Sequence, residues 1–472
     1  MSRNIYHKNI LYPLMLLLYC GLATQSVSQP CKLKIEVLSD SCSSDSLYLQ
    51  HFENNDFVNF MTVKCRQHTV FQQQQPIVPG LYLLTTDSIM LTEILISDTL
   101  HQKFKIILQK DSVSFENSDE NNANIAYHHK LQNTDYQMSI LEQQFYETSS
   151  AFISEQDKKA KMDSLKILAR TKMQKIEIYK QNISQQFPNA LITSLLHATT
   201  EIPEPPSYVY QNQILMIQYE MEHFFDVYPF EDERLLNTPI AFNKFRQYAV
   251  MLYKAGDILP DSLVDRILDK AQVSEKTYNT LFNIWQDVIG DISSPFWTED
   301  VYIEMLKHTI QYDKLDALQT QFYKFQLSRF DKNRKGSLIS DFAIVLPDST
   351  KTNIYSIEGE YILLYFQNTD CPTCVEVCRK LDEIETLNQA IKQGKIKVIT
   401  VYFEKDKEVW QHYIKENANH KYINTWNYNN EIEAKGLFDL SIIPYMFLLD
   451  KDKRVIEKDI SVEDIKDFLD KL

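Results

Sequence analysis

Residues 361–374 read YILLYFQNTDCPTC, and this stretch decides the fold of the C-terminal part of the chain. Its opening segment, Tyr361 to Phe366, is a continuous apolar run, which is typical of a β-strand covered on both faces. A polar turn then leads into Cys371-Pro372-Thr373-Cys374, and apolar residues at helical spacing continue to about Ile391. The sequence therefore predicts a C-x-x-C pair where a buried strand passes into a helix.

The place of the two cysteines favours redox chemistry. Free N–H groups and the helix dipole stabilise negative charge at a helix N-terminus, so the first cysteine becomes a nucleophilic thiolate near neutral pH. The second cysteine, one turn later, is close enough to attack a mixed disulfide and release the product. Zinc sites use the same spacing, but the sequence has no second C-x-x-C and no nearby H-x-x-x-H pair.

The segments around this pair alternate between strands and helices. Further strands are expected at 396–403 and 445–449, and further helices at 408–417 and from about 462 to 472. Alternation of this kind predicts an α/β domain over residues 336–472.

This C-terminal region resembles a thioredoxin-like domain of the extracytoplasmic thiol–disulfide oxidoreductase family. One motif that carries the resemblance is the run from Asp370 to Cys374, whose inner residues Pro372 and Thr373 make it similar to periplasmic reductases of cytochrome c maturation. The other motif is Ile443-Pro444 with the strand that follows it.

The resemblance implies a role for each of these residues. Cys371 is the attacking thiol and Cys374 the resolving thiol. Pro444 is a cis-proline that faces the pair, and the substrate backbone docks there, beside Ile443. No cofactor is implied beyond the redox-active disulfide Cys371–Cys374.

The sequence departs from the family pattern close to the cysteines. Asp370 stands where the family usually has Trp, and its carboxylate is expected to disfavour the Cys371 thiolate and raise the pKa of that thiol. Val377 and Arg379 stand where the family often has a glutamate and a helix-kinking proline, so no proton-transfer partner is evident.

Cys378 is an added thiol, four residues after Cys374 and on the same face of the helix. This spacing is similar to that of copper-binding thioredoxin-fold chaperones, which also have a distal histidine. His412 and His420 are present, but lone histidines are more often solvated or part of a core. We therefore expect no metal site, and we interpret Cys378 as a buried accessory thiol.

Residues 1–28 predict an export signal. Arg3 and Lys8 form a short basic region, and the apolar run after them is too short to span a bilayer. Small residues before Gln29 fit cleavage after Ser28. Cys20 is preceded by a tyrosine, so simple secretion is favoured over lipid anchoring. The expected location is the periplasm or cell envelope, where disulfides persist.

Residues 29–118 predict a small all-β domain. Short alternating segments separated by proline and glycine indicate an antiparallel sandwich or barrel. Cys31, Cys42 and Cys65 can supply one disulfide and leave one thiol over, and the sequence does not fix their pairing.

Residues 122–332 predict an all-α middle domain, with apolar residues at spacings of three and four. Together with the export signal, the β domain and the C-terminal region, it resembles the arrangement of multidomain Bacteroidota proteins. The segments Phe224-Phe225-Asp226 and Asp232 to Pro239 are similar to the helical domain of that group.

Composition excludes other classes of protein. The chain has 472 residues, of which only 8 are glycine, and this disfavours nucleotide sites built on glycine-rich loops. Its formal net charge of −15 is the opposite of what a general nucleic-acid binder needs, so no nucleic-acid partner is expected.

The leading hypothesis is an enzyme, an extracytoplasmic thiol–disulfide oxidoreductase that reduces protein disulfides. Its expected partners are proteins with disulfides or thiols and an electron donor in the membrane or envelope. Two alternatives stay open: a non-catalytic envelope protein that binds a partner and has a structural C-x-x-C, and a thiol-based Cu(I) carrier.

Overall fold

The computed structural model describes residues 33–40, 44–98, 102–258, 262–403, 405–417, 419–440 and 442–472. The predicted export signal at 1–28, with Cys20, lies outside the described residues, and so do Cys31 and Cys42. Among the described residues the chain forms two compact units. One consists of the chain up to Glu201 together with Val227–Asn243, and the other of Ile202–Asp226 together with Lys244–Leu472.

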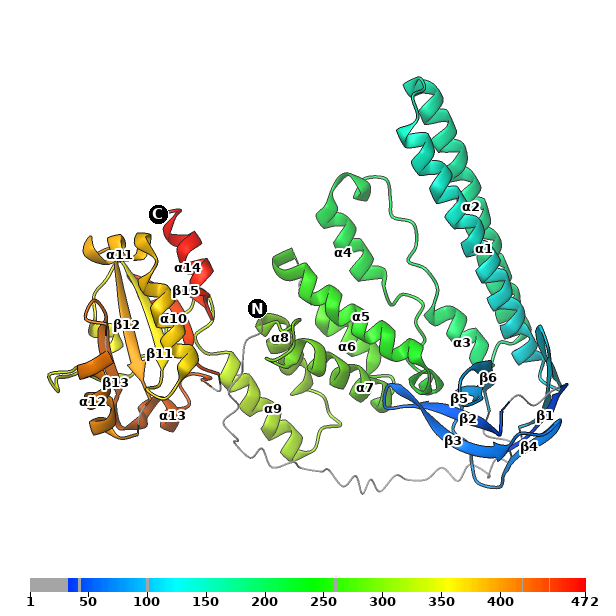
Figure 1. Ribbon diagram of the computed structural model, residues 1–472, viewed down its shortest axis with the longest axis horizontal. Helices are drawn as coiled ribbons and strands as arrows, with labels where there is room; N and C mark the ends of the chain where they lie inside the picture. The colour runs from blue at the N-terminus through cyan, green and yellow to red at the C-terminus, as the bar shows by residue number, and fades with distance from the viewer. Residues whose placement is uncertain are drawn as a thin grey trace. The chain divides into compact units, whose positions relative to one another are not determined.

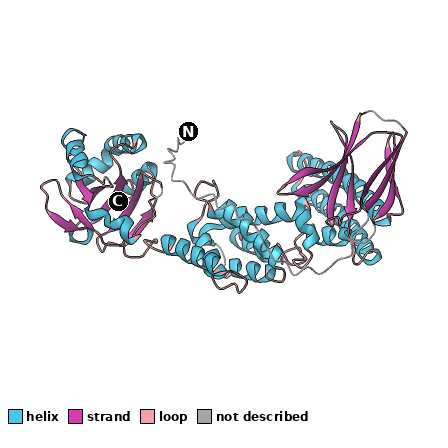
Figure 2. Ribbon diagram, turned by 90° about the horizontal axis from the view of Figure 1, so that it is seen from below, coloured by secondary structure: helices cyan, strands magenta, loops and turns pink. Residues whose placement is uncertain are grey.

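The described part of the first unit contains two four-stranded sheets, with strand orders β4-β1-β7-β8 and β3-β2-β5-β6. Side chains alternate along β1, where Leu33, Ile35 and Val37 are buried and the residues between them are partly exposed. Apolar side chains of both sheets share one core. The strands of this region lie together in Figure 2, which confirms a small all-β region. The strands are β1 (Leu33–Ser39), β2 (Ser46–Glu53), β3 (Asp56–Lys64), β4 (His68–Gln73), β5 (Gly80–Thr85), β6 (Met90–Ile96), β7 (Lys103–Gln109) and β8 (Ser112–Glu116).

Strand direction in this region differs from the expectation in one place. β1 pairs with β7 in parallel, with Ile35 opposite Phe104, so a purely antiparallel arrangement is wrong. Five strands lie between β1 and β7 in the sequence, and four of them form the other sheet. This long connection allows β7 to run parallel to β1, which a short hairpin would not. Buried and exposed side chains alternate in parallel and in antiparallel strands alike, so the sequence pattern could not predict the direction of β7. Cys65 is disulfide-bonded and packs against this core.

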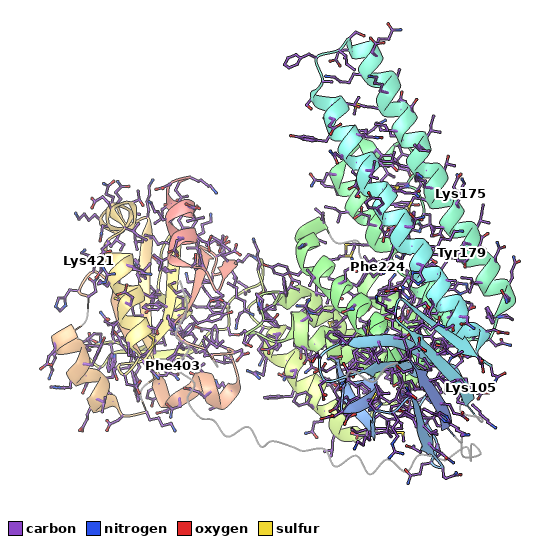
Figure 3. All side chains as sticks on the ribbon, turned by 45° about the vertical axis from the view of Figure 1, so that its right-hand side comes forward. Lys105, Lys175, Tyr179, Phe224, Phe403 and Lys421 are labelled. Atoms are coloured by element: carbon purple, nitrogen blue, oxygen red, sulfur yellow. A yellow bond between two sulfur atoms is a disulfide. The ribbon has the colours of Figure 1, made fainter. Side chains whose placement is uncertain are left out.

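The middle of the chain is helical, as predicted. α1 (Asp119–Ser150) and α2 (Glu155–Gln186) lie side by side as a long hairpin (Figure 1). Lys130 of α1 lies 4.3 Å from the centre of the Tyr179 ring of α2, and Tyr179 is labelled in Figure 3. The shorter helices are α3 (Leu191–Ala198), α4 (Gln213–His223), α5 (Pro239–Ala255), α6 (Leu263–Ala271), α7 (Glu275–Trp285), α8 (Glu299–Thr309) and α9 (Ala317–Phe330).

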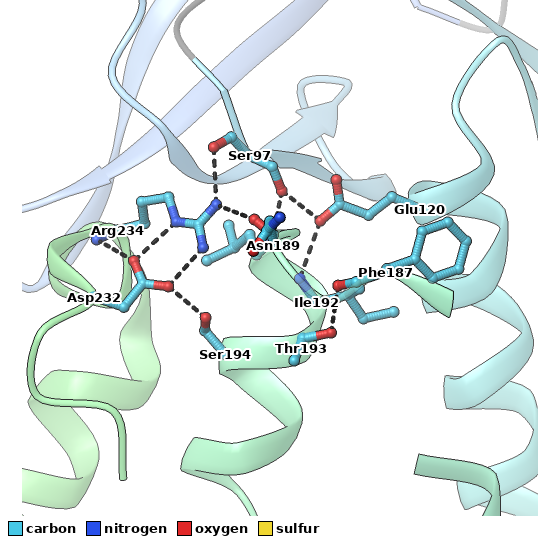
Figure 4. A network of polar contacts seen from close by, with 10 residues as sticks. Ser97, Glu120, Phe187, Asn189, Ile192, Thr193, Ser194, Asp232 and Arg234 are labelled. Atoms are coloured by element: carbon cyan, nitrogen blue, oxygen red, sulfur yellow. Dashed lines mark hydrogen bonds and ion pairs between the residues drawn. The ribbon is translucent and has the colours of Figure 1, made fainter. Parts of the chain in front are cut away.

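Arg234 and Asp232 join distant segments of the first unit (Figure 4). The Arg234 guanidinium lies 2.7 Å from the Asp232 carboxylate and donates to the carbonyl oxygens of Ser97 and Asn189, both at 3.0 Å. Asp232 also accepts from the hydroxyl of Ser194 on α3. Burial alone would raise the pKa of Asp232, but the hydrogen bonds from Arg234 and Ser194 outweigh it and hold that pKa below its usual value.

The same network extends to the first turn of α1. The Ser97 hydroxyl donates to the Glu120 carboxylate at 2.6 Å and accepts from the Leu191 N–H at 2.5 Å. Glu120 also accepts from the Ile192 N–H at 3.0 Å, so it satisfies a free N–H at the start of α3. The network therefore connects the end of β6, the start of α1, the start of α3 and the segment around Arg234.

The C-terminal region is a seven-stranded sheet with the order β10-β9-β13-β12-β11-β14-β15, flanked by helices. Its strands are β9 (Ala343–Val345), β10 (Lys351–Asn353), β11 (Tyr361–Gln367), β12 (Ile396–Tyr402), β13 (Ile423–Asn427), β14 (Tyr445–Asp450) and β15 (Val455–Lys458). The helices described here are α10 (Pro372–Asp382), α11 (Glu385–Lys392), α12 (Lys407–Asn417), α13 (Glu431–Lys435) and α14 (Val462–Leu469).

Both faces of β11 are covered, as its apolar run predicts. Leu363 and Tyr365 pack into a core with residues of α10, α11 and α14. Leu364 and Phe366 pack into the core of the other face, which includes Ile432 of α13. β11 is parallel to β12 and antiparallel to β14, so it is an interior strand of the sheet.

The predicted single helix after the cysteines is wrong in its length. α10 ends at Asp382, and α11 begins at Glu385. Ile384 between them has an extended backbone and is buried, so the turn places an apolar side chain in the core. A helical pattern of apolar residues continues across this break, which is why the sequence did not reveal it. Among the described residues, no helix is both long and apolar enough to cross a membrane.

Candidate redox site

The candidate site lies at the carboxyl end of β11. The chain leaves the sheet at Gln367, passes through a short loop and enters α10 at Pro372. Because β12 is parallel to β11, its end reaches the same edge of the sheet. There the Phe403 N–H donates to the Asn368 side-chain oxygen at 3.2 Å, which fixes the loop before the cysteines to the loop after β12 (Phe403 is labelled in Figure 3).

Cys371 and Cys374 form a disulfide, with an S–S distance of 2.19 Å and a Cα–Cα distance of 5.2 Å. Cys371 is the N-cap of α10, and its Sγ accepts a hydrogen bond from the Cys374 N–H at 3.1 Å. Cys374 is fully buried, whereas Cys371 is half-buried. A free N–H of the first helical turn is therefore aimed at the more accessible sulfur, where it would stabilise a thiolate.

The other residues of the predicted motif lie on the surface beside Cys371. Pro372 is the first residue of α10, and its ring is exposed. Asp370 and Thr373 are exposed on either side of it.

Ile443 and Pro444 come to the same end of the sheet. The Ile443–Pro444 peptide bond is cis, the geometry that the resemblance implies. β14 begins directly after Pro444, with Tyr445 opposite Phe366, so Pro444 lies beside the point where β11 leaves the sheet. Ile443 packs against the same core cluster as the two cysteines.

Tyr365 is a residue of the site that sequence reasoning missed. Its hydroxyl donates to the Cys374 carbonyl oxygen at 2.6 Å, and both groups are buried. Burial raises the pKa of Tyr365 far above its usual value, so the phenol stays protonated and keeps donating. The apolar run at 361–366 predicted a strand covered on both faces, but it did not predict that Tyr365 meets this carbonyl.

Cys378 is a free, half-buried thiol on α10. Burial, with a smaller contribution from the Asp382 carboxylate, raises the pKa of Cys378 to about 11. Within the part of the chain that the structure describes, no group of three or more His, Cys, Asp and Glu side chains is arranged to hold a metal ion.

The high pKa of Cys378 leads to a prediction about its reactivity. In the folded protein at neutral pH the Cys378 thiolate is expected to be about 100-fold scarcer than for an ordinary thiol, because each pKa unit changes it tenfold. Alkylation by iodoacetamide, followed by peptide mass mapping, should be slower by about that factor than in denaturant. Val375 is exposed on the same helix, so Val375→Cys in a Cys378→Ser background is the matched control and should react at an ordinary rate. Equal rates at positions 375 and 378 would contradict the raised pKa of Cys378.

Family models match two regions of the chain. Residues 359–455 match a model described as thioredoxin-like, and residues 164–333 match a domain of unknown function, DUF5106. The first match contains the cysteine pair and Pro444, and the second covers most of the helical region. No curated protein matches the chain.

Solved structures of similar proteins come from Bacteroides and Cytophaga species. A thioredoxin-like protein from Bacteroides caccae is 24% identical with a TM-score of 0.52, and the match covers 57% of this chain and 98% of that one. A domain of a possible thiol-disulfide isomerase from Cytophaga hutchinsonii is 24% identical, with a TM-score of 0.27 and coverage of 30% and 93%. The thioredoxin domain of a thiol-disulfide oxidoreductase from Bacteroides vulgatus is 18% identical, with a TM-score of 0.26 and coverage of 29% and 96%.

The first of these likenesses shows a shared fold, and the family match places the cysteine pair inside it. The C-terminal region of this chain is therefore thioredoxin-like, and it is joined to a β-rich N-terminal region and a helical region that matches DUF5106.

Proposed function

We propose that this protein is an extracytoplasmic thiol–disulfide oxidoreductase that reduces disulfides of envelope or secreted proteins. The observation that carries the proposal is the Cys371–Cys374 disulfide at the N-terminus of α10, with the Cys374 N–H directed at the Cys371 sulfur. Cys371 is partly accessible and Cys374 is buried, and this difference in exposure supports Cys371 as the attacking thiol and Cys374 as the resolving thiol.

The reaction has two exchange steps. The Cys371 thiolate of the reduced protein attacks one sulfur of a substrate disulfide, forms a mixed disulfide and expels the other substrate sulfur as a thiolate. The Cys374 thiolate then attacks the Cys371 sulfur, which forms the protein disulfide and expels the second substrate sulfur. Two electrons pass from the dithiol to the substrate, and the two thiol protons end on the substrate thiols.

The neighbouring residues fit these steps. The α10 N-terminus stabilises the Cys371 thiolate both as nucleophile and as leaving group. The hydrogen bond from Tyr365 to the Cys374 carbonyl holds the first turn in place while the disulfide opens and closes. Pro444 and Ile443, at the same end of the sheet, are the proposed docking point for the substrate backbone.

The oxidised site must be reduced again, so the proposal includes an electron donor in the membrane or envelope. The predicted export signal at 1–28 is the reason for placing the protein in the periplasm or cell envelope. Disulfide-bonded Cys65 is in keeping with an oxidising compartment. Substrates are proteins with disulfides or thiols, and nucleic acid is not among the proposed partners.

The reduction potential of the cysteine pair tests the proposal. The mature protein is equilibrated in thiol buffers, and free thiols are trapped with a mass tag. Cys378→Ser is measured alongside to keep the Cys378 thiol out of the count. We expect a reversible two-thiol transition in both proteins. A reduction potential of about −270 mV, as in thioredoxin, would support a reductant, and one of about −120 mV would make the protein an oxidant instead.

Absence of a reversible transition would reject the redox function. A structural pair would then be indicated if replacing both cysteines by serine lowered the unfolding temperature. Stoichiometric Cu(I) binding that is lost in Cys378→Ser would instead indicate a metal carrier.

A further inference from the structure

The described residues that lead to Pro444 lie outside any helix or strand. α13 ends at Lys435 and β14 begins at Tyr445, and residues 436–440 and 442–444 lie between them. We call these residues the proline loop. A loop of this kind keeps its course through side-chain contacts and packing rather than through a ladder of backbone hydrogen bonds.

Two side chains from the segment after α9 hold the start of the proline loop. The Lys332 ammonium donates to the Gly436 carbonyl oxygen at 2.7 Å, and the Asn333 side-chain amide donates to the Leu437 carbonyl oxygen at 2.8 Å. Asn333 is only 5% exposed, and its side-chain oxygen accepts from the Ser340 N–H at 2.6 Å. Both ends of this amide are therefore used, and they join the loop to the chain that enters the thioredoxin-like domain.

Arg329, in the last turn of α9, forms an ion pair with the proline loop. Its guanidinium donates to the Asp439 carboxylate at 2.5 Å and to the Gln326 side-chain oxygen, one turn earlier, at 3.2 Å. The Asp439 side chain is 11% exposed and the Arg329 side chain 27%, so solvent screens this pair less than a pair on the open surface. Asp439 stands five residues before Pro444, so the pair holds the loop close to the proposed docking point.

The core of the sheet holds the proline loop from its other side. The centre of the Phe438 ring lies 4.9 Å from that of Phe366 and 5.6 Å from that of Phe447. Leu437 and Leu440 pack against the same core. This packing anchors the loop, and the contacts from the end of α9 direct the chain around the anchor. Loss of one polar contact should therefore shift the loop without unfolding it.

The helical region and the thioredoxin-like domain thus meet at the proline loop, within the second compact unit. We infer that Arg329 is a positioning residue, which holds the proline loop in the course that brings Ile443 and Pro444 to a substrate polypeptide. The inference rests on the proposed redox function and adds to it a role for the helical region in substrate docking. A small disulfide without a peptide backbone does not use this docking point, so its reduction should not depend on Arg329.

The experiment compares two disulfides that release the same thiol. One is hydroxyethyl disulfide, and the other is a short uncharged peptide whose single cysteine forms a mixed disulfide with 2-mercaptoethanol. The reduced full-length protein gives two electrons to either compound, and its two thiol protons end on the two thiols that are released. The readout is the second-order rate constant for each compound. An uncharged peptide keeps direct attraction by the Arg329 charge out of the comparison.

In Arg329→Met the rate constant for the peptide should fall about tenfold, since a misplacement of about 1 Å can cost up to about a hundredfold. The rate constant for hydroxyethyl disulfide should stay within about twofold of wild type. Arg329→Lys keeps a positive charge beside Asp439 and should recover part of the peptide rate. The matched control is Arg334→Met, because Arg334 pairs with Asp300 and Asp331, which are outside the proline loop. This control should keep both wild-type rates.

A double variant tests whether Arg329 acts through Asp439. Arg329→Met combined with Asp439→Asn should lose no more of the peptide rate than Arg329→Met alone, because each change removes the same contact. Losses that multiply in the double variant would contradict a shared contact and overturn the assignment to this pair.

Equal losses with both disulfides in Arg329→Met would overturn the inference, because the residue would then act on the cysteines or on the whole fold. An unchanged peptide rate would overturn it as well, and so would an equal loss in Arg334→Met. Hydroxyethyl disulfide separates these failures from failure of the proposed function. If the reduced wild-type protein reacts with neither compound, the redox function itself is rejected; if it reacts and Arg329→Met has no selective effect, only the positioning inference fails.

Discussion

Replacing Cys371 by serine is expected to lower the rate of disulfide reduction by at least about a thousandfold, because it removes the only accessible nucleophile of the pair. Replacing Cys374 by serine should also stop turnover, but at a later step. The Cys371 thiolate still attacks the substrate, and the mixed disulfide persists because the buried sulfur that would resolve it is missing. The two variants therefore differ in what they accumulate.

This difference is measured by non-reducing gel electrophoresis and intact mass after mixing each variant with a disulfide-containing protein. Cys374→Ser should accumulate a covalent adduct that dithiothreitol releases, and Cys371→Ser should not. Cys378→Ser is the control, and it should turn over at the wild-type rate without accumulating an adduct. An adduct that forms on Cys374 in the Cys371→Ser protein would contradict the assigned roles. In cells that produce Cys374→Ser, the same trapped adduct would identify substrates directly.

The parts of this site that could be predicted are those whose residues are close together in the sequence. The strand, the loop and Cys371–Cys374 are contiguous, so local patterns were sufficient to place the disulfide at a helix N-terminus. Pro444 is far away in sequence, and only the family resemblance connected it with the cysteines. The antiparallel register between β11 and β14 brings it there.

Contacts that depend on the tertiary structure could not be predicted. The hydrogen bond from Tyr365 to the Cys374 carbonyl depends on the angle between β11 and α10. The hydrogen bond from the Phe403 N–H to the Asn368 side chain depends on two loops lying close together.

The second large effect is expected in the first unit, where Arg234→Met should destabilise the local structure by about 2–4 kcal/mol. The substitution keeps most of the side-chain volume but leaves the Asp232 carboxylate, which is only 13% exposed, without its cation. The Ser97 and Asn189 carbonyl oxygens also lose their donor. Arg234→Lys should recover only part of the loss, because one ammonium cannot reproduce this set of planar contacts.

Hydrogen exchange measured by mass spectrometry tests this effect locally, since a chain with several domains has no single free energy of unfolding. Amides at the end of β6 and in α3 should lose protection in Arg234→Met. Arg379→Met is the control, because Arg379 forms its ion pairs on the surface and its removal should leave protection in the first unit unchanged. Equal protection in Arg234→Met and wild type would show that the Arg234–Asp232 pair does not stabilise the end of β6 and α3.

The pH dependence identifies Asp232 as the source of the effect. Its pKa is lowered in the folded protein, so the pair stabilises the fold above the unfolded value of about 3.9, and that stabilisation is lost as the pH falls through the folded pKa. In Arg234→Met the positive charge of the guanidinium is missing, so burial raises the pKa of Asp232. The folded variant therefore favours the protonated form of Asp232. The difference in protection between wild type and Arg234→Met should be largest near neutral pH and should shrink below about pH 4. Asp232→Asn combined with Arg234→Met should be less destabilising than Arg234→Met alone at neutral pH, because it removes the unpaired buried charge.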